Sequence, residues 1–162
     1  MDIARKKEIA QTVTAGKAVL GMEFGSTRIK AVLLDAHNRI IAQGHHLWEN
    51  QMVDGLWSYS QEAVIAGMQD CYAALAADVK AVCGAELTHL AGVGISAMMH
   101  GYLAFDSSDR LLVPFRTWRN TNTGAAAEKL TALFNFNIPL RWSVAHLYQC
   151  VLDGESHLQQ LS

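Results

Sequence analysis

Three short apolar segments near the N-terminus constrain the fold of this chain more than any other feature. They cover residues 18–24, 28–34 and 39–45, and only a few turn-forming residues separate each from the next. In the second segment, side chains alternate between one apolar face and one mixed face, as they do in a half-buried strand. Strands joined by turns this short pair with their neighbours. The sequence therefore predicts a three-stranded antiparallel meander.

A long helix and a further strand follow the meander. Apolar residues recur at helical spacing from 64 to 82, with Ser58 or Ser60 as the N-terminal cap and Gly84 at the C-terminal end. Residues 90–96 are small and apolar, which predicts a buried strand reached by a helical crossover. A meander, a crossover helix and a parallel strand together predict an α/β fold with a mixed sheet.

The remaining elements rest on shorter patterns. Residues 1–17 form either a short helix or a loose arm. Thr121 and Ser143 are placed to cap two C-terminal helices. The other assignments are a loop at 48–59, a hairpin with arms 102–105 and 111–113, and helices at 125–134 and 143–152.

Composition excludes several function classes. The net charge is −2, 51% of residues are hydrophobic, and no basic run dominates any segment, so neither nucleic acid nor an anionic membrane is an expected partner. The three cysteines lack the close spacing of metal or redox motifs. No apolar segment of the kind found in signal peptides precedes Thr14. We therefore expect a cytoplasmic protein with free thiols.

The first candidate site is the turn between the first two strands. Glu23 ends an apolar strand, and Gly25 and Ser26-Thr27 follow before the basic residues Arg28 and Lys30. Glycine lets a backbone approach phosphate, the hydroxyls and exposed N–H groups are donors, and either cation can balance the phosphate charge. The carboxylate of Glu23 can hold Mg²⁺ directly or through water. The same residues also fit an ordinary hairpin turn with a solvated acid.

Two further segments suit a small polar ligand. An apolar strand ends near Met99 and His100, where ligands of α/β sheets collect, although both side chains also fit a core. Residues 114–121 group aromatic, guanidinium and amide side chains just before a helix. Such a set can stack on a sugar and bond its hydroxyls, or it can be a packed tryptophan beside a helix cap.

Taken in this order, the three segments resemble the start of the FGGY-family carbohydrate kinases, most closely the xylulokinase branch. The Asp-x-Gly-Thr-Ser/Thr turn and basic strand of that family are similar to residues 23–30, with Glu23 in place of Asp. Its Gln-Met-His-Gly segment is similar to residues 98–101, with Met98 in place of Gln, and its Leu-Trp-Asn-Asp segment to residues 117–120. The resemblance covers about residues 18–150.

The resemblance implies an actin-like, ribonuclease-H-like ATPase lobe at residues 18–162, preceded by an extension at 1–17. It implies an ATP- and Mg²⁺-dependent kinase that phosphorylates a sugar hydroxyl, with a ketopentose such as xylulose or ribulose as acceptor. The implied roles are Mg²⁺ binding and phosphoryl transfer for Glu23, phosphate binding for Gly25, Ser26, Thr27 and Lys30, and sugar binding for Met99, His100, Arg119 and Asn120.

Family kinases also have a second lobe, which carries the adenine pocket and the Asp that acts as general base. By this resemblance both lie beyond residue 162, so we expect a fragment with little or no turnover. A non-catalytic sugar- or nucleotide-binding module built on the same lobe is the alternative. The oligomeric state stays open, and a homo-oligomer is one outcome, since a lobe without its partner exposes apolar surface.

Overall fold

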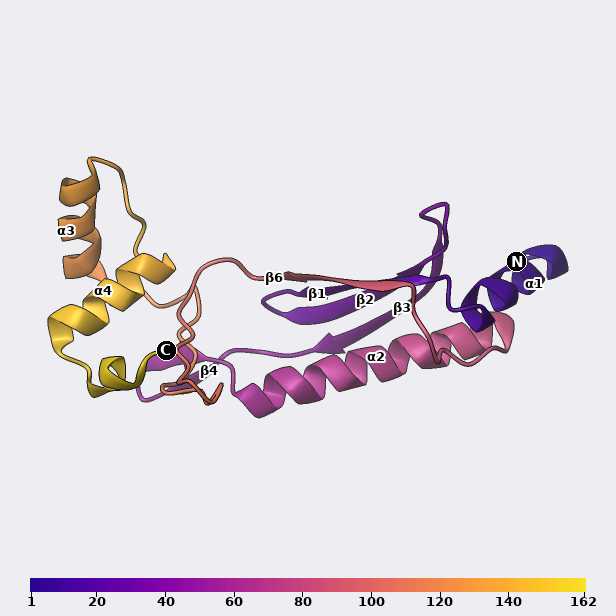
Figure 1. Cartoon of the computed structure of the whole chain (residues 1–162), viewed down its shortest axis with the longest axis horizontal. Helices are drawn as coiled ribbons and strands as arrows, with labels where there is room; N and C mark the ends of the chain where they lie inside the picture. The colour runs from indigo at the N-terminus through magenta and orange to yellow at the C-terminus, as the bar shows by residue number, and fades with distance from the viewer. The chain divides into compact units, whose positions relative to one another are not determined.

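The computed structural model describes all of residues 1–162 and divides them into two compact units (Figure 1). Unit 1 comprises residues 1–49 and 62–98, and unit 2 comprises residues 50–61 and 99–162. None of the helices combines the length and the apolar composition that crossing a bilayer requires. Each unit is described by itself.

A four-stranded mixed sheet forms the centre of unit 1. Its strands are β1 (Val19–Phe24), β2 (Arg28–Leu34), β3 (Ile40–Leu47) and β6 (Gly92–Ala97). The spatial order is β3-β2-β1-β6, with β2 antiparallel to both β1 and β3, and β6 parallel to β1. The predicted meander, crossover and mixed sheet are confirmed. The expectation that the strand after the crossover is buried was wrong, because β6 is an edge strand and almost all of its residues are exposed.

Helix α2 (Gln61–Cys83) makes the crossover and lies along one face of the sheet (Figure 1). Two glycines allow this close approach. A Cβ atom at Gly44 would lie 2.3 Å from the Cys71 carbonyl oxygen, and one at Gly67 would lie 2.8 Å from the Ile29 side chain. Helix and sheet therefore meet with almost no space between their backbones. The helix ends where predicted, at Gly84, whose φ is +75°.

Residues 3–14 form a helix, α1 (Ile3–Thr14), which decides between the two structures expected for the N-terminal segment. Asp2 caps it by accepting a hydrogen bond from the Arg5 amide at 2.7 Å. Ile9 and Val13 are almost completely buried, so the helix packs by an apolar stripe.

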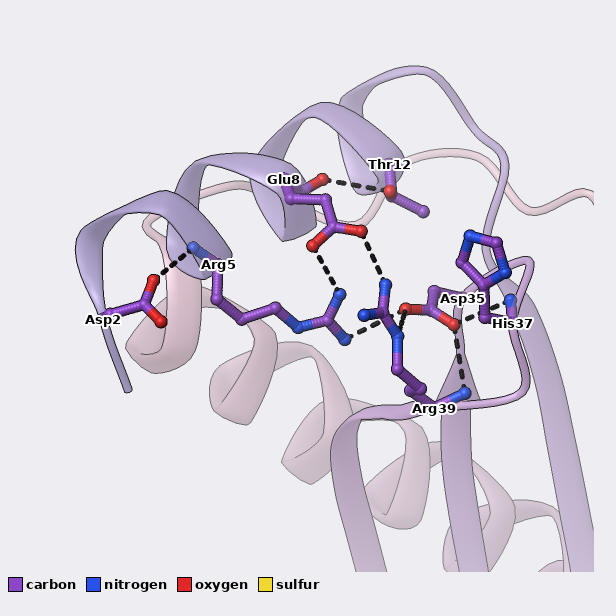
Figure 2. A network of polar contacts seen from close by, with 7 residues as sticks. All are labelled: Asp2, Arg5, Glu8, Thr12, Asp35, His37 and Arg39. Carbon is purple, nitrogen blue, oxygen red and sulfur yellow. Dashed lines mark hydrogen bonds and ion pairs between the residues drawn. The ribbon is translucent and has the colours of Figure 1, made fainter.

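Four charged side chains attach α1 to the turn between β2 and β3 (Figure 2). Asp35 accepts hydrogen bonds from Arg5 at 2.9 Å and Arg39 at 2.8 Å, and Glu8 bonds the same two guanidinium groups at 2.9 and 2.5 Å. Burial opposes the ionisation of Asp35. Hydrogen bonds from the Arg39 and His37 amides and from both arginines outweigh that cost and hold its pKa well below its usual range.

A turn in unit 2, at residues 106–110, has the same hydrogen bonds as the turn at Asp35 but has no helix attached to it. Asp106 accepts hydrogen bonds from the amides two and four residues on, and also from the side chain of Arg110, just as Asp35 does in its own turn. Asn38 and Asp109 occupy the same position of each turn, and both have a φ of +59°. The two turns differ in the added contacts of Asp35 with α1.

This difference predicts that Asp35→Asn destabilises its unit more than Asp106→Asn does. Both variants weaken one turn, but only Asp35→Asn also removes a buried charge that pairs with Arg5. We expect an excess loss of about 2 kcal/mol in the free energy of unfolding, measured by urea denaturation. Equal losses in the two variants would show that α1 is not held by this carboxylate.

Unit 2 contains the hairpin β4 (Gln51–Val53) and β5 (Leu56–Ser58), the helices α3 (Gly124–Phe134) and α4 (Ser143–Asp153), and a 3₁₀ helix, η1 (Ser156–Gln160). Ala127 and Leu130 of α3 pack with Ala145 of α4 and with Ile138 between the helices. Both predicted C-terminal helices are therefore confirmed.

Several sequence assignments in unit 2 were wrong. The expected loop at 48–59 contains the β4–β5 hairpin, whose Asp54-Gly55 turn has φ values of +48° and +79°. Asp-Gly between apolar residues is a hairpin signal, and the sequence reading missed it. The expected hairpin with arms 102–105 and 111–113 is confirmed in part: its turn is present and Phe105 pairs with Leu111, but the arms form isolated bridges instead of strands, and Tyr102 pairs with Arg116, beyond the expected arm.

The predicted helix caps were also misplaced. Helix α3 follows Thr123 and not Thr121, and the Thr123 hydroxyl donates to the Leu140 carbonyl instead of capping the helix. Helix α4 includes Ser143 and follows Trp142. Tertiary contacts therefore decide where these two helices begin.

Candidate functional site

Glu23 and Lys30 lie directly opposite one another on β1 and β2. The Lys30 ammonium is 3.3 Å from the Glu23 carboxylate, and each side chain is about half exposed, at 51% and 52%. An exposed pair like this contributes little to stability and exchanges partners readily. Both groups are therefore available to a ligand that brings its own charges.

The turn that joins these strands is held by Trp48, which the sequence reading did not identify. The Gly25 amide donates to the Arg28 carbonyl at 3.0 Å, and the Gly25 carbonyl accepts a hydrogen bond from the Trp48 indole at 2.7 Å. The Trp48 amide also donates to the Thr27 carbonyl at 3.3 Å. A Cβ atom at Gly25 would lie only 2.9 Å from the Arg28 carbonyl oxygen, so this turn requires glycine.

A shallow cleft of about 410 Å³ lies beside the turn, lined by residues of β1, β2 and β6 that include Glu23, Lys30 and Ser96. Gly21 and Gly94 face one another in register on β1 and β6, so backbone forms part of its floor. The lining is mainly apolar, from Met22, Val32 and Ile95, and Glu23 and Lys30 supply the charges that suit a divalent cation and a phosphate ester. All five residues predicted to bind nucleotide or metal lie on this β1–β2 hairpin.

The four residues predicted to bind sugar lie in unit 2. His100 has a φ of +70°, a conformation that non-glycine residues seldom adopt, and its ring stacks on Trp142 with centroids 6.0 Å apart. The Gly101 amide donates to the Arg141 carbonyl at 3.1 Å. Met99, beside His100, is 74% exposed. Trp142 thus orients the imidazole, a contact that no local sequence pattern indicates.

Arg119 and Asn120 both contact β5. The Arg119 guanidinium lies 3.9 Å from the centroid of the Trp57 ring, a cation–π contact. Asn120 is 4% exposed, and its side chain bonds both the amide and the carbonyl of Trp57 at 2.8 Å. The amide of Asn120 is therefore fully used within the protein, whereas Arg119 remains exposed.

Cys150, Glu155 and His157 place three potential metal ligands within 4.8 Å of one another. The Arg116 guanidinium already lies among them, donating to Glu155 at 2.5 and 3.0 Å and to the Cys150 sulfur at 3.2 Å. A permanently charged cation in this position repels a second cation. Burial also raises the pKa of the Cys150 thiol, which disfavours the thiolate that a metal binds. The cluster is an ion-pair network and does not suit a metal ion.

Beside this network, His146 of α4 is completely buried, and neither ring nitrogen has a hydrogen-bond partner. Burial and, to a smaller extent, the charge of Arg116 lower the pKa of His146 from 6.5 to about 4. The imidazole is therefore neutral in the folded protein at neutral pH.

This shift predicts that unit 2 loses stability on acidification. The unfolded chain binds a proton near pH 6.5 that the folded chain binds only near pH 4, so stability is complete above 6.5 and falls as the pH drops toward 4. The loss should approach about 3 kcal/mol in urea denaturation series. It should shrink in His146→Leu and persist in His37→Gln, an exposed control. An equal loss in His146→Leu would mean that another group titrates.

Comparison with known proteins supplies a family. A sequence model of the N-terminal domain of the FGGY family of carbohydrate kinases matches residues 18–139. A xylulose kinase from Klebsiella pneumoniae is 27% identical over 124 residues, which cover 70% of this chain and 22% of that enzyme. The chain therefore spans about a fifth of the length of that curated relative.

Solved structures agree on the fold. The crystal structure of a xyloylose kinase from Brucella ovis matches with a TM-score of 0.76 and 20% identity, over 89% of this chain and 31% of that one. A gluconate kinase from Lactobacillus acidophilus matches with a TM-score of 0.71 and 17% identity, over 89% and 30%. The actin-like, ribonuclease-H-like α/β lobe with a mixed sheet, expected from the sequence, is confirmed.

Proposed function

This chain belongs to the FGGY family of carbohydrate kinases, and we propose that it forms the N-terminal part of an ATP-dependent kinase that phosphorylates a sugar hydroxyl. A ketopentose such as xylulose or ribulose is the proposed acceptor. The observation that carries the proposal is the β1–β2 hairpin, where exposed Glu23 and Lys30 flank a turn that requires glycine, inside the region that matches the family.

In this proposal the hairpin binds the phosphates of ATP and its Mg²⁺. Lys30 neutralises phosphate charge, and Ser26 and Thr27 donate hydrogen bonds from a turn that Gly25 keeps narrow. Glu23 holds the cation through water, and its donor chemistry fits, because hard divalent cations prefer carboxylate and water oxygens. When bound, the cation neutralises charge that develops on the transferred phosphoryl group.

Met99 and His100 contact the sugar. The exposed methionine packs on its carbon face, and the imidazole, fixed by Trp142, bonds a hydroxyl. Arg119 lies near the sugar and can donate to a further hydroxyl. Asn120 acts on the sugar indirectly, because its amide ties the segment to Trp57.

Turnover needs more than these groups. Phosphoryl transfer requires a base near the acceptor hydroxyl and closure of two lobes around both substrates. The chain spans 22% of the length of the curated relative, and we propose that the base, an Asp, belongs to the remainder of such a kinase. This chain alone is then expected to bind its ligands without turnover.

Calorimetric titration of the chain with xylulose, ribulose and Mg-ATP, beside a coupled ADP-release assay, tests the function. We expect binding of one ketose and of Mg-ATP without sugar-dependent ADP release. His100→Ala should abolish sugar binding and keep Mg-ATP binding, whereas His37→Ala should keep both. Unchanged sugar affinity in His100→Ala would contradict its role, and steady sugar-dependent ADP release would show that the chain is a complete enzyme.

We predict that Gly25→Ala weakens the binding of Mg-ATP and leaves the binding of sugar unchanged. The added Cβ would lie 2.9 Å from the Arg28 carbonyl oxygen, so the turn must widen and its donors must move. We expect Mg-ATP affinity to fall at least about tenfold, with sugar affinity unchanged. Gly92→Ala is the matched control, because Gly92 lies on the same sheet outside the cleft and its Cβ would meet no atom within 4 Å. Equal Mg-ATP affinities in the two variants would remove the turn from the nucleotide site.

A further inference from the structure

The proposed sugar segments are residues 99–100 and 119–120. One pair of backbone hydrogen bonds joins the chain just after the first segment to the chain just before the second. The Tyr102 amide donates to the Arg116 carbonyl at 2.8 Å, and the Arg116 amide donates back to the Tyr102 carbonyl at 3.0 Å. Tyr102 follows His100 by two residues, and Arg116 precedes Arg119 by three. The bridge therefore lies within three residues of both segments.

Both side chains of the bridge are buried, and both contact the segment that follows α4. Arg116 is 5% exposed, and its guanidinium makes two hydrogen bonds to the Glu155 carboxylate. The Tyr102 hydroxyl lies 2.8 Å from His157 Nε2, and His157 Nδ1 lies 3.4 Å from Glu155. The guanidinium carbon lies 5.5 Å from the centroid of the Tyr102 ring. One carboxylate thus contacts both strands of the bridge, directly or through His157.

The end of α4 determines where this carboxylate lies. Gly154 has a φ of +65°, and the Glu155 amide donates to the Cys150 carbonyl at 3.0 Å, which turns the chain sharply before η1. Glu155 is 39 residues from Arg116 in sequence, so the pair joins distant parts of unit 2. A buried guanidinium without its carboxylate is costly, which couples the bridge to the end of α4.

We infer that Glu155 is a positioning residue for the sugar site, acting through Arg116 and, by way of His157, through Tyr102. The inference rests on the proposed function in one respect, namely that residues 99–100 and Arg119 contact the sugar. Glu155 touches neither segment. It fixes the bridge from which both extend, so that the orientation of His100 and Arg119 depends on a charge outside the site.

Glu155→Gln tests this, because it keeps the shape of the side chain and removes its charge. Glu155→Asp keeps the charge on a shorter side chain, and Glu128→Gln, on the exposed face of α3, is the control. We expect amide hydrogen exchange at Tyr102 and Arg116 to quicken about tenfold or more in Glu155→Gln, and sugar affinity to fall by a similar factor. Mg-ATP affinity should be unchanged, and Glu155→Asp should restore part of both losses.

Unchanged amide exchange in Glu155→Gln would overturn the inference. So would parallel losses of sugar and Mg-ATP affinity, because they would indicate general destabilisation of the chain. If the wild-type chain binds no ketose, the proposed function fails on that result alone. The exchange rates then still decide whether Glu155 holds the bridge.

Discussion

Unit 1 depends on the contact between α2 and the sheet, which only glycine allows. Any side chain at Gly44 would meet the backbone of α2 near Cys71 and Leu75. The helix carries the chain back along the sheet, and β6 then pairs parallel to β1. That pairing brings Gly94 opposite Gly21 and forms the open floor of the cleft beside Glu23. Glycines therefore serve both faces of this sheet: Gly44 admits the helix on one, and Gly21 and Gly94 leave the cleft open on the other.

Two carboxylate–cation pairs, Glu23–Lys30 in the proposed nucleotide site and Glu155–Arg116 outside the proposed sugar site, show how burial assigns different roles to the same chemistry. Glu23 and Lys30 are half exposed, so water solvates both charges and little free energy opposes their separation. Glu155 and Arg116 are largely removed from water, so separating them leaves an unpaired charge in a poor dielectric. The first pair can open to admit a phosphate and a cation. The second can only hold backbone in place.

Sequence reasoning found the features that repeat locally and missed those that link distant residues. The alternation of Ile29, Ala31 and Leu33 and the helical spacing from 64 to 82 predicted the sheet and α2, because burial imposes these periods on neighbouring residues. Residue chemistry singled out the three proposed binding segments, and the family resemblance assigned roles to their residues. Trp48 bonds a glycine 23 positions earlier, and Asn120 bonds a backbone 63 positions earlier. No local pattern encodes such distances.

The attachment of α1 combines a local turn with a contact between residues that are distant in sequence. The turn at Asp106 shows that an Asp, two amides and an Arg four residues on complete this structure with local groups alone. In the turn at Asp35 the first carboxylate oxygen binds the amides, and the second, which bonds Arg39, also accepts Arg5 from α1. The family match begins at residue 18, after α1 ends. The helix is thus held by an oxygen that the turn has already oriented, and the turn does not need the helix in order to form.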